Sequence, residues 1–142
     1  MSNLFSHSAA THPLSETDRL QWLRLSRTEN VGPITFYRLI EHYGSPREAL
    51  SALPELAKRG GRKKPLIAPN TDVIEREYDA LQKLGGHIIC VLDEAYPLAL
   101  SAIDDAPPVI SVLGNTNLLN KNCIAMVGSR NASINGRKFA SK

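Results

Sequence analysis

The hydrophobic pattern of this chain changes at Gly85 and Gly86. Before this pair, apolar residues recur with the period of an amphipathic α-helix. After it, they form short continuous runs that are rich in β-branched residues and that end at glycine or polar turn residues. The pattern therefore predicts a helical domain over residues 15–84 and the start of an α/β domain over residues 85–142.

Capping signals divide the first part into several helices. Ser15 and Asp18 have the spacing of a capping box, in which each side chain caps the backbone of the other residue. Gly44 occupies the position of a glycine C-cap, where a left-handed backbone ends a helix. The predicted helices span about residues 15–27, 33–43, 45–53, 54–59 and 71–84.

The second part contains three runs that read as strands, over residues 87–92, 108–113 and 123–127. One or two helical turns are expected between the first two, over residues 96–103. The runs are apolar throughout instead of alternating, as is typical of parallel strands covered on both faces. Because Cys90 and Cys123 each lie inside such a run, we expect both to be buried, reduced thiols, which fits a cytoplasmic protein.

The sharpest functional signal is Gly128-Ser129-Arg130, directly after the third run. Glycine allows the backbone to approach an anion closely, and the amides that follow would point at it. Arginine adds a permanent forked charge that suits phosphate. An arginine that instead pairs with a neighbouring carboxylate is the alternative interpretation. The spacing matches neither the dinucleotide-binding fingerprint nor the P-loop.

The charge distribution supports a polyanionic partner. The net charge is +3, but residues 106–142 contain five basic residues and no acidic one. A second basic cluster covers residues 58–64. Two such clusters favour a polyanion, although solvated surface segments would have the same composition.

Several other classes of function find no support in the sequence. No histidine has a nucleophile or carboxylate partner fixed nearby, so no catalytic residue is assigned. The acidic pair of Asp93 and Glu94 is expected to have a solvated cap or turn role. The cysteines have no companions at metal-ligand spacing, so neither a metal site nor a cofactor is expected. Residues 1–14 lack the features of a secretory signal and read as a disordered tail, and no apolar run is long enough to cross a membrane.

The segment from Val31 to Gly44 resembles half of a helix–hairpin–helix module, in which a glycine turn offers amides to a DNA phosphate. Pro33 removes one of those donors. A phosphate contact and a purely structural or protein-contact role therefore both remain open for this turn.

Taken in order, the motifs of the chain resemble the DNA-processing protein A (DprA, also Smf) family. The resemblance covers about residues 15–142 and is carried by these segments: Gly32-Pro33, Tyr43-Gly-Ser45, Tyr96-Pro97 with Leu100, Pro107-Pro-Val-Ile110, Leu113-Gly114, and Ile124-Ala-Met-Val-Gly-Ser-Arg130 with Gly136. It implies a sterile-alpha-motif-like helical domain followed by the first strands of a Rossmann-like parallel sheet. An Asn135 stands where family members often have an aromatic residue.

The resemblance also implies a function. Family members bind single-stranded DNA without catalysis and help to load a RecA-type recombinase during natural transformation. By position, Gly128, Ser129 and Arg130 would contact a backbone phosphate, and we add Lys138 in the basic segment that follows. We expect these 142 residues to be part of a longer family member. A homodimer, if formed as in the family, would therefore use parts that are not in this chain. A phosphoribohydrolase-like nucleotide-binding enzyme and a protein-contact module without DNA binding are the alternatives.

Overall fold

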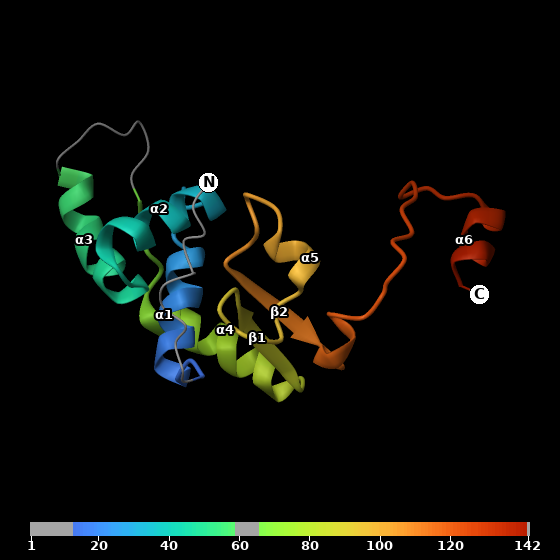
Figure 1. Ribbon diagram of the computed structural model, residues 1–142, viewed down its shortest axis with the longest axis horizontal. Helices are drawn as coiled ribbons and strands as arrows, with labels where there is room; N and C mark the ends of the chain where they lie inside the picture. Colours follow the sequence, from blue (N-terminus) through green and yellow to red (C-terminus); the bar gives the residue numbers. More distant parts are fainter. Residues whose placement is uncertain (1–12, 59–65, 142) are drawn as a thin grey trace.

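The computed structural model describes residues 13–58 and 66–141. Four helices form the first part, a two-stranded antiparallel sheet packs against them, and an extended segment leads away to a last short helix (Figure 1). The predicted tail is described only from residue 13 on. The basic cluster over residues 58–64 lies, apart from the backbone of Lys58, outside the described residues.

The first helices begin and end largely where the capping signals predict. They are α1 (Glu16–Ser26), α2 (Pro33–Tyr43), α3 (Pro46–Lys58) and α4 (Thr71–Lys83). The capping box of α1 is confirmed, because the Asp18 amide donates to Ser15 Oγ at 3.1 Å and the Ser15 amide donates to Asp18 Oδ2 at 3.3 Å. Gly44 caps α2 with φ of +84°, also as predicted.

The prediction of a separate helix over residues 54–59 is wrong, since α3 continues through Pro54 without a break. Proline removes one backbone donor from a helix interior and is normally unfavourable there. Ala49 and Leu53 are both buried in the core. We attribute the continuity of α3 to this packing, which outweighs the local preference for a break.

A single hydrophobic core extends across the glycine pair at residues 85 and 86. Trp22 and Phe36 are buried side by side, with ring centroids 5.2 Å apart. The same cluster includes residues of α1, α2, α4 and both strands: Leu23, Leu25, Leu39, Ile74, Tyr78, Ile88, Cys90 and Val109. The helices and the sheet therefore bury apolar surface against each other.

The two strands pair antiparallel, so the prediction that they are parallel is wrong. Strand β1 (Gly86–Cys90) aligns with β2 (Val109–Leu113) so that Ile88 faces Ser111. The connection contains the one-turn helix α5 (Leu98–Ser101) and folds back on itself, because the Tyr96 hydroxyl donates to the Pro107 carbonyl oxygen at 2.6 Å. Ile88 and Ile89 point to opposite faces and are both buried, which explains why the run looks like a parallel strand.

Gly86, the first residue of β1, lies where a side chain would force two leucine side chains to move. A Cβ atom at this position would lie 2.8 Å from Leu113 Cδ2 and would overlap the side chain of Leu81 in α4. Gly85, directly before it, has φ of +72° and ends the helical segment. The glycine pair thus marks the change of structure that the hydrophobic pattern predicts.

The third predicted strand, over residues 123–127, does not form in the structure. After β2, a 3₁₀ turn η1 (Thr116–Leu118) leads into an extended segment and then to α6 (Ile134–Ala140). We call residues 119–141 the arm, which projects away from the helices and the sheet (Figure 1). Ile124 is 97% exposed and Val127 is 94% exposed, since no described strand lies beside this run. Cys123 is exposed, contrary to prediction, whereas Cys90 is buried as predicted.

Among the described residues, no helix combines the length and the apolar composition that a membrane crossing requires.

Candidate nucleic-acid interface

The predicted anion loop lies in the arm and is open to solvent. Gly128, Ser129 and Arg130 are all exposed. The Asn131 amide donates to Ser129 Oγ at 3.2 Å, which closes a small turn around the arginine. Within residues 13–58 and 66–141, Arg130 has neither an ion pair nor a hydrogen bond. The described residues therefore contain no ion pair between Arg130 and a neighbouring carboxylate, which was the alternative interpretation.

Helix α6 follows the loop. Ser133 is its N-cap and accepts a hydrogen bond from the Gly136 amide at 3.1 Å. A Cβ atom at Gly136 would lie 3.4 Å from Ser133 Oγ, which is an ordinary contact distance, so this cap does not itself require glycine. Arg137 and Lys138 lie in the last turn, and both side chains are exposed. The arm thus presents the predicted loop and Lys138 within one short basic segment.

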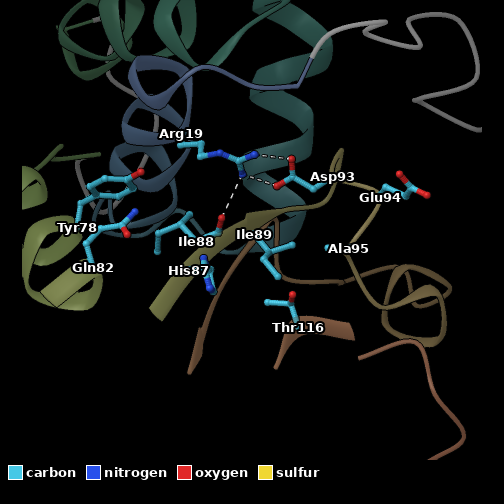
Figure 2. Close-up of a pocket in the computed structure, with 10 residues that line it drawn as sticks. All are labelled: Arg19, Tyr78, Gln82, His87, Ile88, Ile89, Asp93, Glu94, Ala95 and Thr116. Carbon is cyan, nitrogen blue, oxygen red and sulfur yellow. Dashed lines mark hydrogen bonds and ion pairs between the residues drawn. The ribbon is translucent and has the colours of Figure 1, made fainter. Parts of the chain in front are cut away.

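A hollow in the structure lies elsewhere, at the outer side of β1. It has a volume of about 390 Å³ and is open to solvent. Helices α1 and α4 contribute Arg19, Tyr78 and Gln82, while His87 comes from β1 and Thr116 from η1 (Figure 2). None of the predicted site residues lines it.

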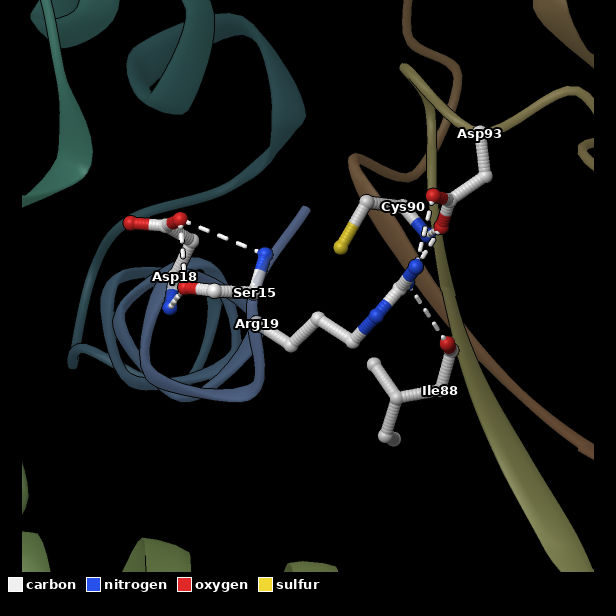
Figure 3. A network of polar contacts seen from close by, with 6 residues as sticks. All are labelled: Ser15, Asp18, Arg19, Ile88, Cys90 and Asp93. Carbon is white, nitrogen blue, oxygen red and sulfur yellow. Dashed lines mark hydrogen bonds and ion pairs between the residues drawn. The ribbon is translucent and has the colours of Figure 1, made fainter. Parts of the chain in front are cut away.

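An ion pair between Arg19 and Asp93 forms one wall of this hollow (Figures 2 and 3). Arg19 Nη2 lies 2.8 Å from Asp93 Oδ1, and Arg19 Nη1 donates to the Ile88 carbonyl oxygen at 3.1 Å. Asp93 Oδ2 accepts a hydrogen bond from the Cys90 amide at 2.7 Å. The hydrogen bond to Asp93 raises the pKa of the Arg19 guanidinium above its usual value, so Arg19 keeps its positive charge. Asp93 has the expected cap and turn role, because it bonds the Cys90 amide, but its side chain is only 13% exposed and paired, so the expectation that it is solvated is wrong.

Sequence reasoning missed this pair because Arg19 and Asp93 are 74 residues apart. Each looks like an ordinary surface charge in its own segment. The sequence does contain a local signal for the role of Asp93, because an aspartate three residues after Cys90 can cap the amide at the end of the strand. Nothing in the sequence indicates that an arginine of α1 reaches this carboxylate.

A second contact joins the helices to the connection between the strands. The Tyr37 hydroxyl, from α2, donates to the Ala106 carbonyl oxygen at 2.9 Å. Burial raises the pKa of Tyr37 to about 12, with a smaller contribution from Tyr96. This contact holds the residue before Pro107 against the helical part, while the bond from Tyr96 to Pro107 lies within the connection itself.

The glycine turn of the helix–hairpin–helix segment is accessible. Gly32 is the N-cap of α2, it is exposed, and a Cβ atom there would meet no other group within 4 Å. Pro33 occupies the first helical position, as predicted. A phosphate contact at this turn stays a prediction.

Two protein-family models match the chain. A DprA-like N-terminal HHH domain matches residues 16–80, and DNA recombination-mediator protein A matches residues 87–142. The chain belongs to the DprA family. Among curated proteins, the DNA processing protein DprA of Streptococcus pneumoniae is 44% identical over 52 residues, which is 37% of this chain and 18% of that relative. The resemblance drawn from the motifs is thereby confirmed.

The boundary between the two DprA matches falls between α4 and β1. Both contacts described above cross it, since Arg19 and Tyr37 belong to the first match whereas Asp93 and Ala106 belong to the second. In this DprA family member, the two matched segments are therefore joined by side-chain hydrogen bonds as well as by the shared core.

Proposed function

We propose that this DprA family member binds single-stranded DNA without sequence preference and without catalysis. The observation that carries the proposal is Arg130, which is exposed and without a partner among the described residues. A guanidinium in this state is free to form a charged, bidentate pair with a phosphate. Such contacts give affinity but carry no sequence information.

The surroundings of Arg130 favour the same partner. Lys121, Arg137 and Lys138 lie in the same arm, and no carboxylate occurs from residue 106 onward. A segment with only positive charge attracts a polyanion and does not satisfy itself internally. Phe139 is 72% exposed, and an exposed aromatic ring is the kind of platform on which an unpaired base stacks.

The biological role follows from family membership together with this chemistry. A protein that coats single-stranded DNA through its backbone can protect incoming DNA during natural transformation and pass it to a RecA-type recombinase. A cytoplasmic location, a homodimer and a Rossmann-like domain that begins near residue 85 belong to the same proposal. The homodimer and the Rossmann-like domain come from the family resemblance, and the free thiols of Cys90 and Cys123 also fit the cytoplasmic location.

Substitution of Arg130 tests the proposed function. We expect Arg130→Ala to weaken binding of a labelled single-stranded oligonucleotide by about 1–3 kcal/mol, the value of a charged hydrogen bond. The slope of log affinity against log salt should become shallower by about 0.7, because one fewer phosphate is neutralised. Fluorescence anisotropy at two salt concentrations measures both quantities.

Arg76→Ala is the matched control, since it removes the same charge from an exposed side chain that is paired with Asp72 on α4. It should leave affinity and salt slope nearly unchanged. Equal losses in the two variants would show that only net charge matters, and no loss in Arg130→Ala would remove Arg130 from the site.

A further inference from the structure

The first turn of α6 contains a step with a chemistry of its own. Asn135-Gly136 is the only Asn-Gly step in the sequence. The backbone nitrogen after an asparagine can attack the side-chain amide carbon of that asparagine. Glycine hinders this attack least, because it has no Cβ atom and leaves the backbone free to move. The question is therefore what restrains the Gly136 nitrogen in the folded chain.

The N-cap of α6 holds this nitrogen. The Gly136 amide donates to Ser133 Oγ at 3.1 Å, and the Arg137 amide donates to the Ser133 carbonyl oxygen at 3.0 Å. Asn135 lies between these anchored amides and Ser133, inside the first turn of the helix. Its own side-chain amide has no hydrogen bond among the described residues, so no polar partner holds it in place.

Attack requires this arrangement to open. The Gly136 nitrogen must lose its proton before it can attack Asn135 Cγ, and an N–H that donates to Ser133 Oγ gives up its proton less readily. Helical backbone angles also keep this nitrogen away from the side-chain carbon of the preceding residue. The first turn of α6 therefore protects Asn135 while it is formed, and the protection ends whenever the turn opens locally.

We propose that Asn135 is a deamidation site that the Ser133 cap controls. When the turn opens, the Gly136 nitrogen attacks Asn135 Cγ and a new C–N bond forms. The side-chain nitrogen leaves as ammonia, taking up the proton that the backbone nitrogen releases. Water then opens the five-membered succinimide ring at either carbonyl and leaves an aspartate or an isoaspartate. Water is the only co-reactant, and nothing is oxidised or reduced.

The reaction changes the charge of the basic segment. Residues 106–142 contain five basic residues and no acidic one, and the new carboxylate lies within three residues of Arg137 and Lys138. A negative charge at this position weakens the attraction to phosphate. This consequence rests on the proposed function, whereas the chemistry at Asn135 does not.

Peptide mapping by mass spectrometry, on the full chain aged in neutral buffer, measures the reaction. Asn131 is the internal control, because it lies in the same arm but precedes Ala132. We expect the mass increase of deamidation to accumulate at Asn135 and to lag behind at Asn131. The reaction at Asn135 should also be faster in urea than in the folded chain. Equal rates at the two asparagines, or a rate at Asn135 that unfolding leaves unchanged, would overturn the proposal.

Two substitutions act on the cap and on the attacking residue. Ser133→Ala removes the bond to the Gly136 nitrogen, and we expect deamidation to be about fivefold faster, since the turn opens more often without its N-cap. Gly136→Ala should suppress the reaction, because it adds a Cβ beside the nitrogen and favours the helix. The cap tolerates this Cβ, which would lie 3.4 Å from Ser133 Oγ.

Ser141→Ala is the matched control for Ser133→Ala. It removes a serine hydroxyl that donates to the Arg137 carbonyl oxygen at the other end of the same helix. Its deamidation rate should equal that of the unsubstituted chain. Equal acceleration in the two serine variants would show that the Ser133 cap is not the control, and an unchanged rate in Gly136→Ala would exclude attack by that nitrogen.

The effect on DNA is measured separately, so that its failure differs from failure of the chemistry. Asn135→Asp has the charge of the product from the start, and Asn135→Gln is its neutral control. By fluorescence anisotropy, we expect Asn135→Asp to bind a single-stranded oligonucleotide about threefold more weakly than Asn135→Gln at low salt. Equal affinities would overturn the link to DNA binding, whereas absence of the mass increase at Asn135 would overturn the deamidation itself.

Discussion

The Tyr37 hydroxyl donates a hydrogen bond to the Ala106 carbonyl oxygen across 69 residues of sequence, at 2.9 Å. Tyr37 belongs to the second helix of the helical part, and Ala106 directly precedes the Pro107-Pro108 step into β2. Ala106 is 3% exposed, so its carbonyl is not easily solvated in place of this bond. The contact therefore adds a buried hydrogen bond to the shared core and the Arg19–Asp93 pair that join the helices to the sheet.

We expect Tyr37→Phe to lower the free energy of unfolding by about 1–3 kcal/mol, because the Ala106 carbonyl is left buried without its partner. Urea denaturation followed by circular dichroism measures the change. Tyr43→Phe is the matched control, since its partly exposed ring contacts His42 and its removed hydroxyl has no hydrogen bond within the described residues. Equal effects of the two substitutions would show that the bond to Ala106 does not stabilise the fold.

Stability should fall at alkaline pH. Burial raises the pKa of Tyr37 from 10.0 to about 12, and the proton is therefore held more tightly in the folded state than in the unfolded state. A group of this kind contributes its full stability below the unfolded pKa and loses it as pH rises through the folded pKa. Denaturation midpoints should thus decrease between about pH 10 and 12, and the decrease should be smaller in Tyr37→Phe. A pH profile that the substitution leaves unchanged would contradict this assignment.

The two cysteines should differ strongly in reactivity. Burial raises the pKa of the Cys90 thiol to about 12, and its side chain is fully covered, whereas Cys123 is exposed in the arm. Only the thiolate reacts at an appreciable rate. A thiol reagent at pH 7.5 should label Cys123 quickly and Cys90 only after unfolding, and Cys123→Ser should remove the fast phase. Fast labelling that persists in Cys123→Ser would mean that Cys90 is not protected.

The sequence predicted the elements that local signals determine. The capping box at Ser15, the C-cap at Gly44 and the change of structure at Gly85 all depend on neighbouring residues and are confirmed. Strand direction was not predictable, because a run buried on both faces, such as Ile88 and Ile89, reads the same in parallel and antiparallel sheets. Residues 123–127 carry a strand-like pattern, but a strand also needs a neighbour to take its hydrogen bonds.

In the candidate site, too, the features that depend on neighbouring residues could be predicted, whereas the contacts between distant segments could not. The turn at Ser129 and the N-cap at Ser133 are local features, and the structure contains them next to the predicted arginine. The contacts of Arg19 with Asp93 and of Tyr37 with Ala106 depend on how distant segments pack, and no pattern within either segment indicates them.

The most direct test of the proposed function is an NMR titration of the isotope-labelled protein with a short single-stranded oligonucleotide. We predict that the amide resonances of Gly128, Ser129 and Arg130 shift first and that the shifts diminish with added salt. Shifts centred instead on Gly32 and the start of α2, with the resonances of the arm unchanged, would contradict the account and place the nucleic-acid interface in the helical part.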